Sequence, residues 1–260
     1  MAKAIVIVSF GTANLEGLKI LEDFENKIRE SFNGKYHVCK AFTSSMISNI
    51  LFTKYGKSVP RLEEVLFNLS NDRYKEVYIQ PLHIIEGSEY LSIVKTIEEY
   101  DYSFSKITLG RVIMGENEGR LMEGCNLIVD SMEEDLNKSK NLVLVGHGSK
   151  VMDTEGYNLL KNTFLERGFK SVFIGTLDGE NKREDVVNAL IDNKINETIM
   201  APILMLPGNH IVKDIFGNKN SWKSLFQENN ITVESSEKSL LEYDEIRNFY
   251  IELIDNNINR

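Results

Sequence analysis

The sequence predicts an α/β protein with two similar halves, each a parallel sheet flanked by helices. Two observations support this fold class. Short apolar runs of strand length alternate with longer segments of helical periodicity along the chain, a pattern typical of parallel strands joined by crossover helices. Several strand motifs also recur in the same order in the second half of the sequence.

The predicted strands are apolar over most of their length, which favours burial on both faces of a sheet. They are Ala4–Ser9, Tyr36–Phe42, Glu76–Leu82, Ile107–Val112, Leu142–Gly146, Ser171–Ile174 and Thr198–Leu204. Between the first two strands, an apolar stripe of helical period comprises Leu15, Leu18, Leu21, Phe24, Ile28 and Phe32. Pro60 and Ser88 mark the starts of two further predicted helices.

Two pairs of segments indicate an internal duplication. Ile7–Thr12 resembles Leu144–Ser149, so Phe10 matches His147. The segment from Tyr78 to Glu89 resembles that from Met200 to His210, so Glu89 matches His210. A repeat this long indicates duplication of a domain rather than a solenoid, although apolar strands also match by chance. We expect a boundary within the polar stretch 114–140, and domains at 1–130 and 131–260.

Composition limits the classes of partner. The 260 residues are 42% hydrophobic, enough for a substantial core, and carry a net charge of -9. This acidity argues against nucleic acid and anionic membrane as partners. The N-terminal apolar run is too short for a signal peptide, and no apolar run approaches the ~20 residues that span a bilayer. Cys39 and Cys125 form no CxxC motif, so we expect a cytoplasmic protein.

Two of the four histidines follow predicted strands, at the edge where ligands bind in parallel α/β sheets. His147 lies between Gly146 and Gly148, and His210 follows Pro207–Asn209. Each histidine taken alone is also typical of an ordinary turn or loop. Two imidazoles that emerge at one edge, however, suit proton transfer or the binding of a divalent metal.

Two carboxylates follow strands in a comparable way. Asp178 lies between Gly175 and Gly179 after the predicted strand Ser171–Ile174, although Asp-Gly is also typical of a solvated turn. Glu89 takes the place of His210 in the first half, although a glutamate there is also favoured by the helix dipole. Both remain candidates for the site.

Other segments are less informative. His83 lies in an apolar run and is expected in the core or in the wall of a cleft, and Phe10 either packs in the core or forms a flat apolar wall. The sequence contains no P-loop, Gly-x-Gly-x-x-Gly, Gly-x-Ser-x-Gly or His-Glu-x-x-His pattern. Nucleotide hydrolysis, hydride transfer from a Rossmann site and serine hydrolysis are therefore disfavoured.

Taken together, these segments resemble the anaerobic-type sirohydrochlorin cobaltochelatases, relatives of ferrochelatase. The resembling pieces run nearly end to end, and their order and spacing carry the resemblance. They are Ser9–Thr12, Ala41–Ser44, Gln80–Ile85 with Gly87, Glu89 and Tyr90, then Gly146–Gly148, Gly175–Thr176, Gly208–His210 and Ser221–Trp222.

The resemblance implies two similar α/β lobes with an active-site cleft between them. It implies a lyase that inserts Co²⁺ into sirohydrochlorin during anaerobic cobalamin biosynthesis. In this family the residues matching His147 and His210 are metal ligands, and the first also accepts a proton. Asp178 takes the place of an acidic metal ligand, and Glu89 that of a catalytic glutamate from the other lobe. No cofactor is implied beyond the substrate metal, which is Co²⁺ or, as alternatives, Fe²⁺ or Ni²⁺.

Departures from the family pattern concern the metal and the ring more than the fold. The acidic ligand is usually glutamate, so Asp178 is one methylene shorter. Lys150, Val151 and Met152 replace the usual polar residues after Gly-His-Gly. Asn209 replaces an aspartate beside the second histidine, and Glu180-Asn181 replaces a Tyr-Pro.

Sirohydrochlorin is a polycarboxylate, so an acidic protein needs a locally basic site to bind it. Lys150 and Lys213 each follow a candidate histidine by three residues and are predicted to supply this charge, although both could simply be solvated. The other predicted substrate contacts are His83, Phe10, Gly11 and Thr12.

Three alternatives stay open at this point. They are a ferro- or nickelochelatase on the same fold, a non-catalytic carrier of metal or tetrapyrrole, and a transferase in which His147 is a metal-independent acid–base. The predicted partners are the tetrapyrrole and a divalent metal. The sequence leaves the oligomeric state, including a homo-oligomer, undecided.

Overall fold

The computed structural model describes residues 2–115, 117–148 and 153–258. The chain divides into two compact units, one of residues 1–116 with 247–260 and one of residues 117–246. These units differ from the predicted domains 1–130 and 131–260 at two places. Residues 117–130 belong to the second unit, and the C-terminal residues 247–260 return to the first.

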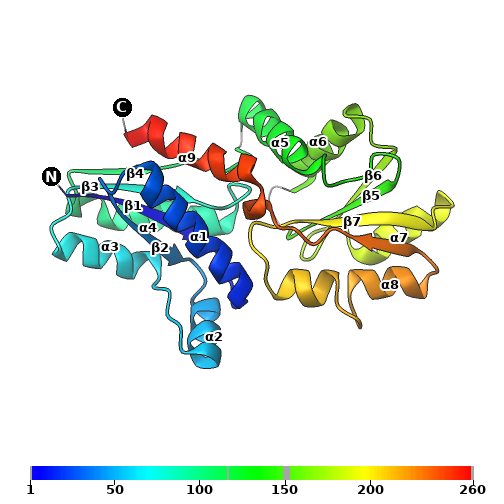
Figure 1. Ribbon diagram of the computed structural model, residues 1–260, viewed down its shortest axis with the longest axis horizontal. Coiled ribbons are helices and arrows are strands. Elements are labelled where there is room, and N and C mark those ends of the chain that lie inside the picture. The colour runs from blue at the N-terminus through cyan, green and yellow to red at the C-terminus, as the bar shows by residue number, and fades with distance from the viewer. Residues whose placement is uncertain (1, 116, 149–152, 259–260) are drawn as a thin grey trace. The chain divides into compact units, whose positions relative to one another are not determined.

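The first unit holds a four-stranded parallel sheet in the order β2-β1-β3-β4 (Figure 1). Its strands are β1 (Lys3–Ser9), β2 (His37–Phe42), β3 (Glu76–Pro81) and β4 (Lys106–Leu109). Its helices are α1 (Leu15–Ser31), α2 (Ser45–Tyr55), α3 (Leu62–Asn71), α4 (Ser88–Tyr100) and most of α9 (Asp244–Ile258), with a 3₁₀ turn, η1, at Asp101–Ser103.

The second unit holds another four-stranded parallel sheet in the order β6-β5-β7-β8. Its strands are β5 (Asn141–Gly146), β6 (Ser171–Thr176), β7 (Glu197–Ile203) and β8 (Thr232–Ser235). Its helices are α5 (Glu118–Met132), α6 (Asp153–Glu166), α7 (Arg183–Asp192) and α8 (Trp222–Glu228), with a π-helix η2 (His210–Ile215) and a 3₁₀ turn η3 (Leu240–Glu242). The two sheets have the same strand order, as the predicted duplication requires.

Apolar side chains on both faces of each sheet form the cores. In the second unit, Val143, Val145 and Met200 pack with side chains of α7, η2 and α8. Leu142 and Leu144, on the opposite face, are also fully buried, and Figure 1 shows α5 and α6 covering that side. Burial on both faces explains why the strands read as continuous apolar runs.

Two elements lack the apolar pattern by which strands and helices are predicted from the sequence. Strand β8 lies at the edge of its sheet and has no buried residue, so it lacks an apolar run. Helix α2 buries only Leu51 and leaves Met46 and Phe52 each 62% exposed. Its apolar residues therefore do not form the one-sided stripe by which an amphipathic helix is recognised.

Some predicted strand ends also shift. The strand predicted at Ile107–Val112 ends at Leu109, and beyond this end Gln80 Nε2 donates a hydrogen bond of 3.0 Å to the carbonyl oxygen of Arg111. The strand predicted at Ser171–Ile174 continues to Thr176. This extension carries β6 to the same level as the end of β5.

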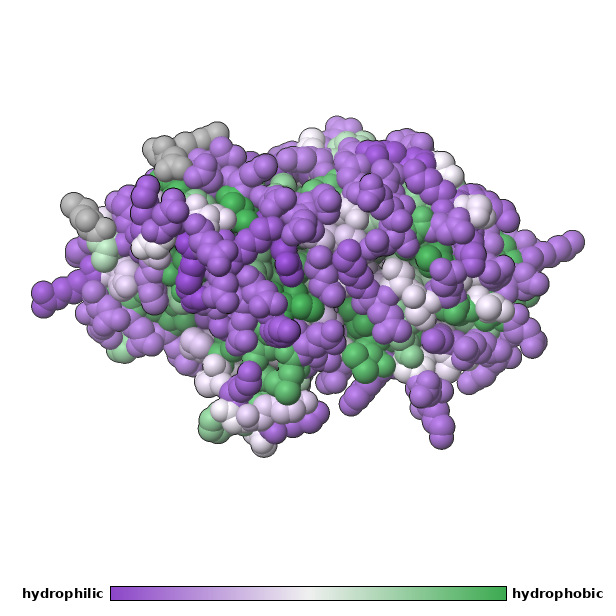
Figure 2. Space-filling model, in the orientation of Figure 1, coloured by the Kyte–Doolittle hydropathy of each residue, from purple (hydrophilic) through white to green (hydrophobic). Residues whose placement is uncertain are grey.

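The surface in Figure 2 is mainly hydrophilic, in keeping with the net charge of -9. Paler, more apolar atoms cover the segment where Figure 1 places α2. Within the described residues, no helix combines the length and the apolar character needed to cross a membrane.

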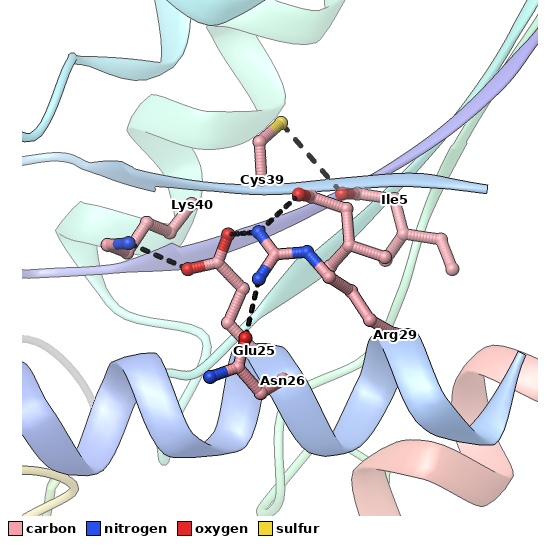
Figure 3. A network of polar contacts seen from close by, with 7 residues as sticks. Ile5, Glu25, Asn26, Arg29, Cys39 and Lys40 are labelled. Carbon is pink, nitrogen blue, oxygen red and sulfur yellow. Dashed lines mark hydrogen bonds and ion pairs between the residues drawn. The ribbon is translucent and has the colours of Figure 1, made fainter. Parts of the chain in front are cut away.

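A buried carboxylate joins α1 to the edge strand β2 (Figure 3). Glu25 is 4% exposed and forms ion pairs with Arg29 and, at 2.7 Å, with Lys40. Arg29 also donates a hydrogen bond of 3.0 Å to the carbonyl oxygen of Val38. Burial raises the pKa of the neighbouring Cys39 thiol to about 12, and the Glu25 carboxylate adds to this effect. Burial, with the help of Glu25, therefore keeps Cys39 protonated and unreactive at neutral pH.

We expect Glu25→Ala to lower the free energy of unfolding by about 2–3 kcal/mol, because it leaves the Lys40 ammonium largely buried without its partner. The half-exposed Arg29 keeps the loss at the lower end for buried pairs. Urea denaturation measures the effect. Glu30→Ala, at an exposed position of the same helix, is the control and should change stability by less than ~0.5 kcal/mol. Equal effects of the two substitutions would contradict this account.

Candidate active site

His147 follows the last residue of β5, a central strand of the second sheet. Gly148 has a φ of +85°, which glycine adopts without strain. A Cβ at this position would lie 2.6 Å from the backbone nitrogen of Gly179. Glycine here therefore permits the sharp turn after His147 and the close approach of the neighbouring loop.

The loop after β6 is bound to the loop after β5 through the backbone. The Leu177 N–H donates to the carbonyl oxygen of Gly146 at 3.0 Å, and the Asp178 N–H donates to that of His147 at 2.8 Å. These bonds continue the β5–β6 pairing beyond the ends of the strands. They place a carboxylate oxygen of Asp178 3.9 Å from His147 Nε2, at the sheet edge where the sequence predicted it.

His210 begins the π-helix η2, which follows β7 after a short loop. Ile211 and Ile215 bury one side of this helix in the core of the second unit. His210 lies on the outer side with its side chain 44% exposed, and its Nδ1–H donates a hydrogen bond of 2.7 Å to the carboxylate of Asp214.

The two predicted imidazoles lie side by side. The ring centroids of His147 and His210 are 5.2 Å apart and the rings are nearly perpendicular, at 88°. His147 Nδ1 donates to the carbonyl oxygen of Gly148 at 3.1 Å, as His210 Nδ1 donates to Asp214. In the neutral form of each ring the lone pair is therefore on Nε2. Two neighbouring imidazoles of this kind can bind a divalent metal or accept protons.

A complete metal site is not assembled. Among the described residues, no three His, Cys, Asp or Glu side chains are grouped closely enough to hold a metal ion. The predicted role of Asp178 as a third ligand therefore remains a prediction. The arrangement supplies two nitrogen donors with a carboxylate nearby.

The predicted residues of the first unit lie at the corresponding sheet edge. Phe10 and Gly11 follow β1, and Glu89 lies in the first turn of α4, as His210 lies in the first turn of η2. Thr12 is buried, and its hydroxyl accepts a hydrogen bond of 3.1 Å from the backbone N–H of Asn14, which caps α1. Thr12 therefore helps to hold the start of α1, besides its predicted contact with substrate.

The two lysines predicted to bind substrate carboxylates each follow one of the histidines by three residues. Lys213 is exposed on η2, three residues after His210. Lys150 lies outside the described residues.

His83 lies just beyond the end of β3, and both of its ring nitrogens are buried. Neither nitrogen has a hydrogen-bond partner within the described part of the chain. Burial lowers the pKa of His83 to about 4. The imidazole is therefore neutral at neutral pH.

Asp214 is a functional candidate that the sequence analysis missed. The sequence feature that could have identified it is its position four residues after His210, a spacing that brings two side chains together on one face of a helix. This spacing is informative only on a helix, and the sequence predicted no helix after His210.

Comparison with known proteins assigns the chain to a family. The family described as "Cobalt chelatase (CbiK)" matches residues 3–259. The sirohydrochlorin cobaltochelatase CbiKC of Nitratidesulfovibrio vulgaris is 27% identical over 225 residues, which cover 85% of this chain and 78% of the relative. The sirohydrochlorin cobaltochelatase of Salmonella typhimurium is 26% identical over 230 residues, which cover 87% of this chain and 85% of the relative.

A solved structure shows the same fold. It is the sirohydrochlorin chelatase SirB from Bacillus subtilis subspecies spizizenii in complex with cobalt. It matches with a TM-score of 0.65 and 14% identity, and the match covers 98% of this chain and 94% of that one.

Because the ring nitrogens of His83 are buried, we expect acid to lower the stability of the folded protein. Its pKa is about 4 in the folded state and about 6.5 in the unfolded state, so the unfolded state binds more protons between these values. The free energy of unfolding therefore keeps its full contribution from the neutral ring above pH 6.5. It should fall by roughly 3 kcal/mol as the pH is lowered to 4.

His83→Gln removes this titration. The difference between the unfolding free energies of wild type and His83→Gln should therefore shrink or change sign as the pH falls, when both are measured in urea across this range. Parallel stability curves would show that His83 does not titrate in this way.

Proposed function

This chain belongs to the cobalt chelatase family, and on that premise we propose that it inserts Co²⁺ into sirohydrochlorin during anaerobic cobalamin biosynthesis. The observation that carries the proposal is the pair of imidazoles, His147 and His210, with ring centroids 5.2 Å apart. Two relatives named as sirohydrochlorin cobaltochelatases, similar over most of their length, support it.

Metal insertion exchanges one divalent cation for two pyrrole N–H protons. His147 and His210 bind the incoming cation through Nε2, the nitrogen with the lone pair in the tautomer that their hydrogen bonds select. The Asp178 carboxylate, 3.9 Å from His147 Nε2, offsets part of the charge of the cation. As the metal passes to the ring nitrogens, the His147 imidazole accepts one pyrrole proton, and Glu89 accepts the second.

The carboxylates of the substrate require positive charge at the site. Lys213, exposed one turn from His210 on η2, is proposed to bind one of them, and Lys150 another. Phe10, Gly11 and His83 are proposed to contact the tetrapyrrole from the first unit, together with Thr12. No cofactor beyond the substrate metal is needed, because the exchange of a cation for protons involves no change of oxidation state.

One feature supports a cytoplasmic location. Cys39 and Cys125 are unpaired thiols, as expected in a reducing compartment. Burial raises the pKa of Cys125 to about 12, so this thiol is also unreactive at neutral pH.

The direct test mixes purified protein with sirohydrochlorin and Co²⁺, Fe²⁺ or Ni²⁺ in separate reactions, and follows the visible absorption of the ring. We expect Co²⁺ insertion to exceed the uncatalysed rate by the largest factor. A larger rate increase with Fe²⁺ or Ni²⁺ would show that this metal, and not cobalt, is the preferred substrate. Binding of ring and metal without any rate increase would identify a carrier instead of an enzyme.

His147→Ala should reduce Co²⁺ insertion by at least ~100-fold, because it removes both a metal ligand and a proton acceptor. The fold should be intact, since this side chain is about half exposed. Initial rates of insertion and the unfolding midpoint check both statements.

His37→Ala is the matched control. His37 is an exposed histidine that packs on Tyr74 in the first unit, so its removal should leave the insertion rate near that of wild type. A His147→Ala variant as active as the His37→Ala variant would refute the assignment of His147.

A further inference from the structure

Asp214 has one described interaction, and it is with a candidate metal ligand. Its side chain is 51% exposed, and its carboxylate accepts the hydrogen bond of 2.7 Å from His210 Nδ1. Within the described part of the chain, it forms no ion pair with a lysine or arginine. The side chain of Asp214 therefore makes no other ion pair or hydrogen bond with the described residues.

The π-helix fixes this pair in space. The Phe216 N–H donates to the carbonyl oxygen of Ile211 at 3.0 Å, which closes a wide π turn. Ile211 and Ile215 anchor the helix in the core. His210 and Asp214 remain on the outer side, four residues apart, where their side chains meet.

The position of the carboxylate decides which nitrogen can bind metal. An ionised carboxylate only accepts hydrogen bonds, so Nδ1 of His210 must carry the hydrogen. The lone pair of the neutral ring is then on Nε2, on the other side of the imidazole. Asp214 thus contacts the ring away from the metal-binding nitrogen and does not occupy the position of a ligand.

His147 reaches the same tautomer by another route. Its Nδ1 donates to the backbone carbonyl of Gly148 at 3.1 Å. A hydrogen bond to a carboxylate is shorter and stronger than one to a neutral carbonyl. The side chain of Asp214 therefore does for His210, at the start of a short helix, what the backbone does for His147 beside its strand.

We infer that Asp214 is a positioning residue for metal insertion, which holds the His210 ring in one orientation and in the Nδ1–H tautomer so that Nε2 faces the cation. This inference rests on the proposed function, because it takes His210 to be a metal ligand. Carboxylates that orient metal-binding histidines contribute about 10- to 100-fold to metal affinity.

The tautomer can be measured without activity. The chain has only four histidines, so ¹⁵N NMR of protein labelled on histidine resolves each ring, and His210→Ala identifies the signals of His210. In the neutral form of the ring, wild-type His210 should show a protonated Nδ1 and an unprotonated Nε2. Asp214→Ala should lose this single-tautomer signature.

Kinetics then test the consequence for the metal. Asp214→Ala should lower kcat/KM for Co²⁺ by about 10- to 100-fold, mainly through a higher KM for Co²⁺. Asp214→Glu, whose longer side chain can still reach Nδ1, should recover most of the loss. Asp192→Ala, at an exposed position at the end of α7, is the matched control and should behave as wild type.

The outcomes separate the inference from the proposed function. An unchanged His210 tautomer together with an unchanged KM for Co²⁺ in Asp214→Ala would overturn the inference, even if His210→Ala is inactive. Failure of Asp214→Glu to restore activity, with the tautomer retained, would also count against it. Wild-type insertion by His210→Ala would overturn the proposed role of His210, and the positioning role of Asp214 with it.

Discussion

The parallel pairing of β5 with both of its neighbours is the constraint on which the candidate site depends. Gly146, the last residue of β5, lies opposite Thr176 of β6 and opposite Ile203 of β7. Three strands thus end at one level, and the segments that leave them start from the same edge. Two backbone hydrogen bonds then extend the pairing of β5 and β6 into their loops. The backbone consequently brings the imidazole of His147 and the carboxylate of Asp178 to the same sheet edge.

The core of the second unit anchors the elements that carry these exposed side chains. The rings of His147 and His210 are each nearly half exposed, so packing around them contributes little to their orientation. The elements beneath them are instead anchored by buried residues, those of β5 and the two isoleucines of η2. Gly175 allows Trp222 to pack against the end of β6, where a Cβ would lie 2.1 Å from the indole ring. The site therefore consists of exposed polar side chains carried by elements that are closely packed in the core. This is a common arrangement for side chains that must contact substrate.

A pair of imidazoles suits a metal that is a substrate. Structural zinc sites are closed by four protein ligands and retain the ion. Here the described residues place two nitrogen donors side by side, and a cation held by two imidazoles would keep open positions for water or ring nitrogens. Such a site can receive a metal and release it to a competing ligand.

The sequence by itself determined the fold class, the repeated strand order and the placement of His147, Asp178 and His210 at strand ends, because apolar periodicity and glycine-rich exits are local features. It could not show that the two imidazoles lie 5.2 Å apart, which requires the register between β5 and β7. It missed Asp214 and the edge strand β8, since a helix anchored by only two buried isoleucines and a strand without buried residues leave little pattern. The division at 116/117, and the return of the C-terminal helix to the first unit, were likewise decided by tertiary packing. Contacts between residues distant in sequence leave no periodic signal in a single chain, and only the folded structure reveals them.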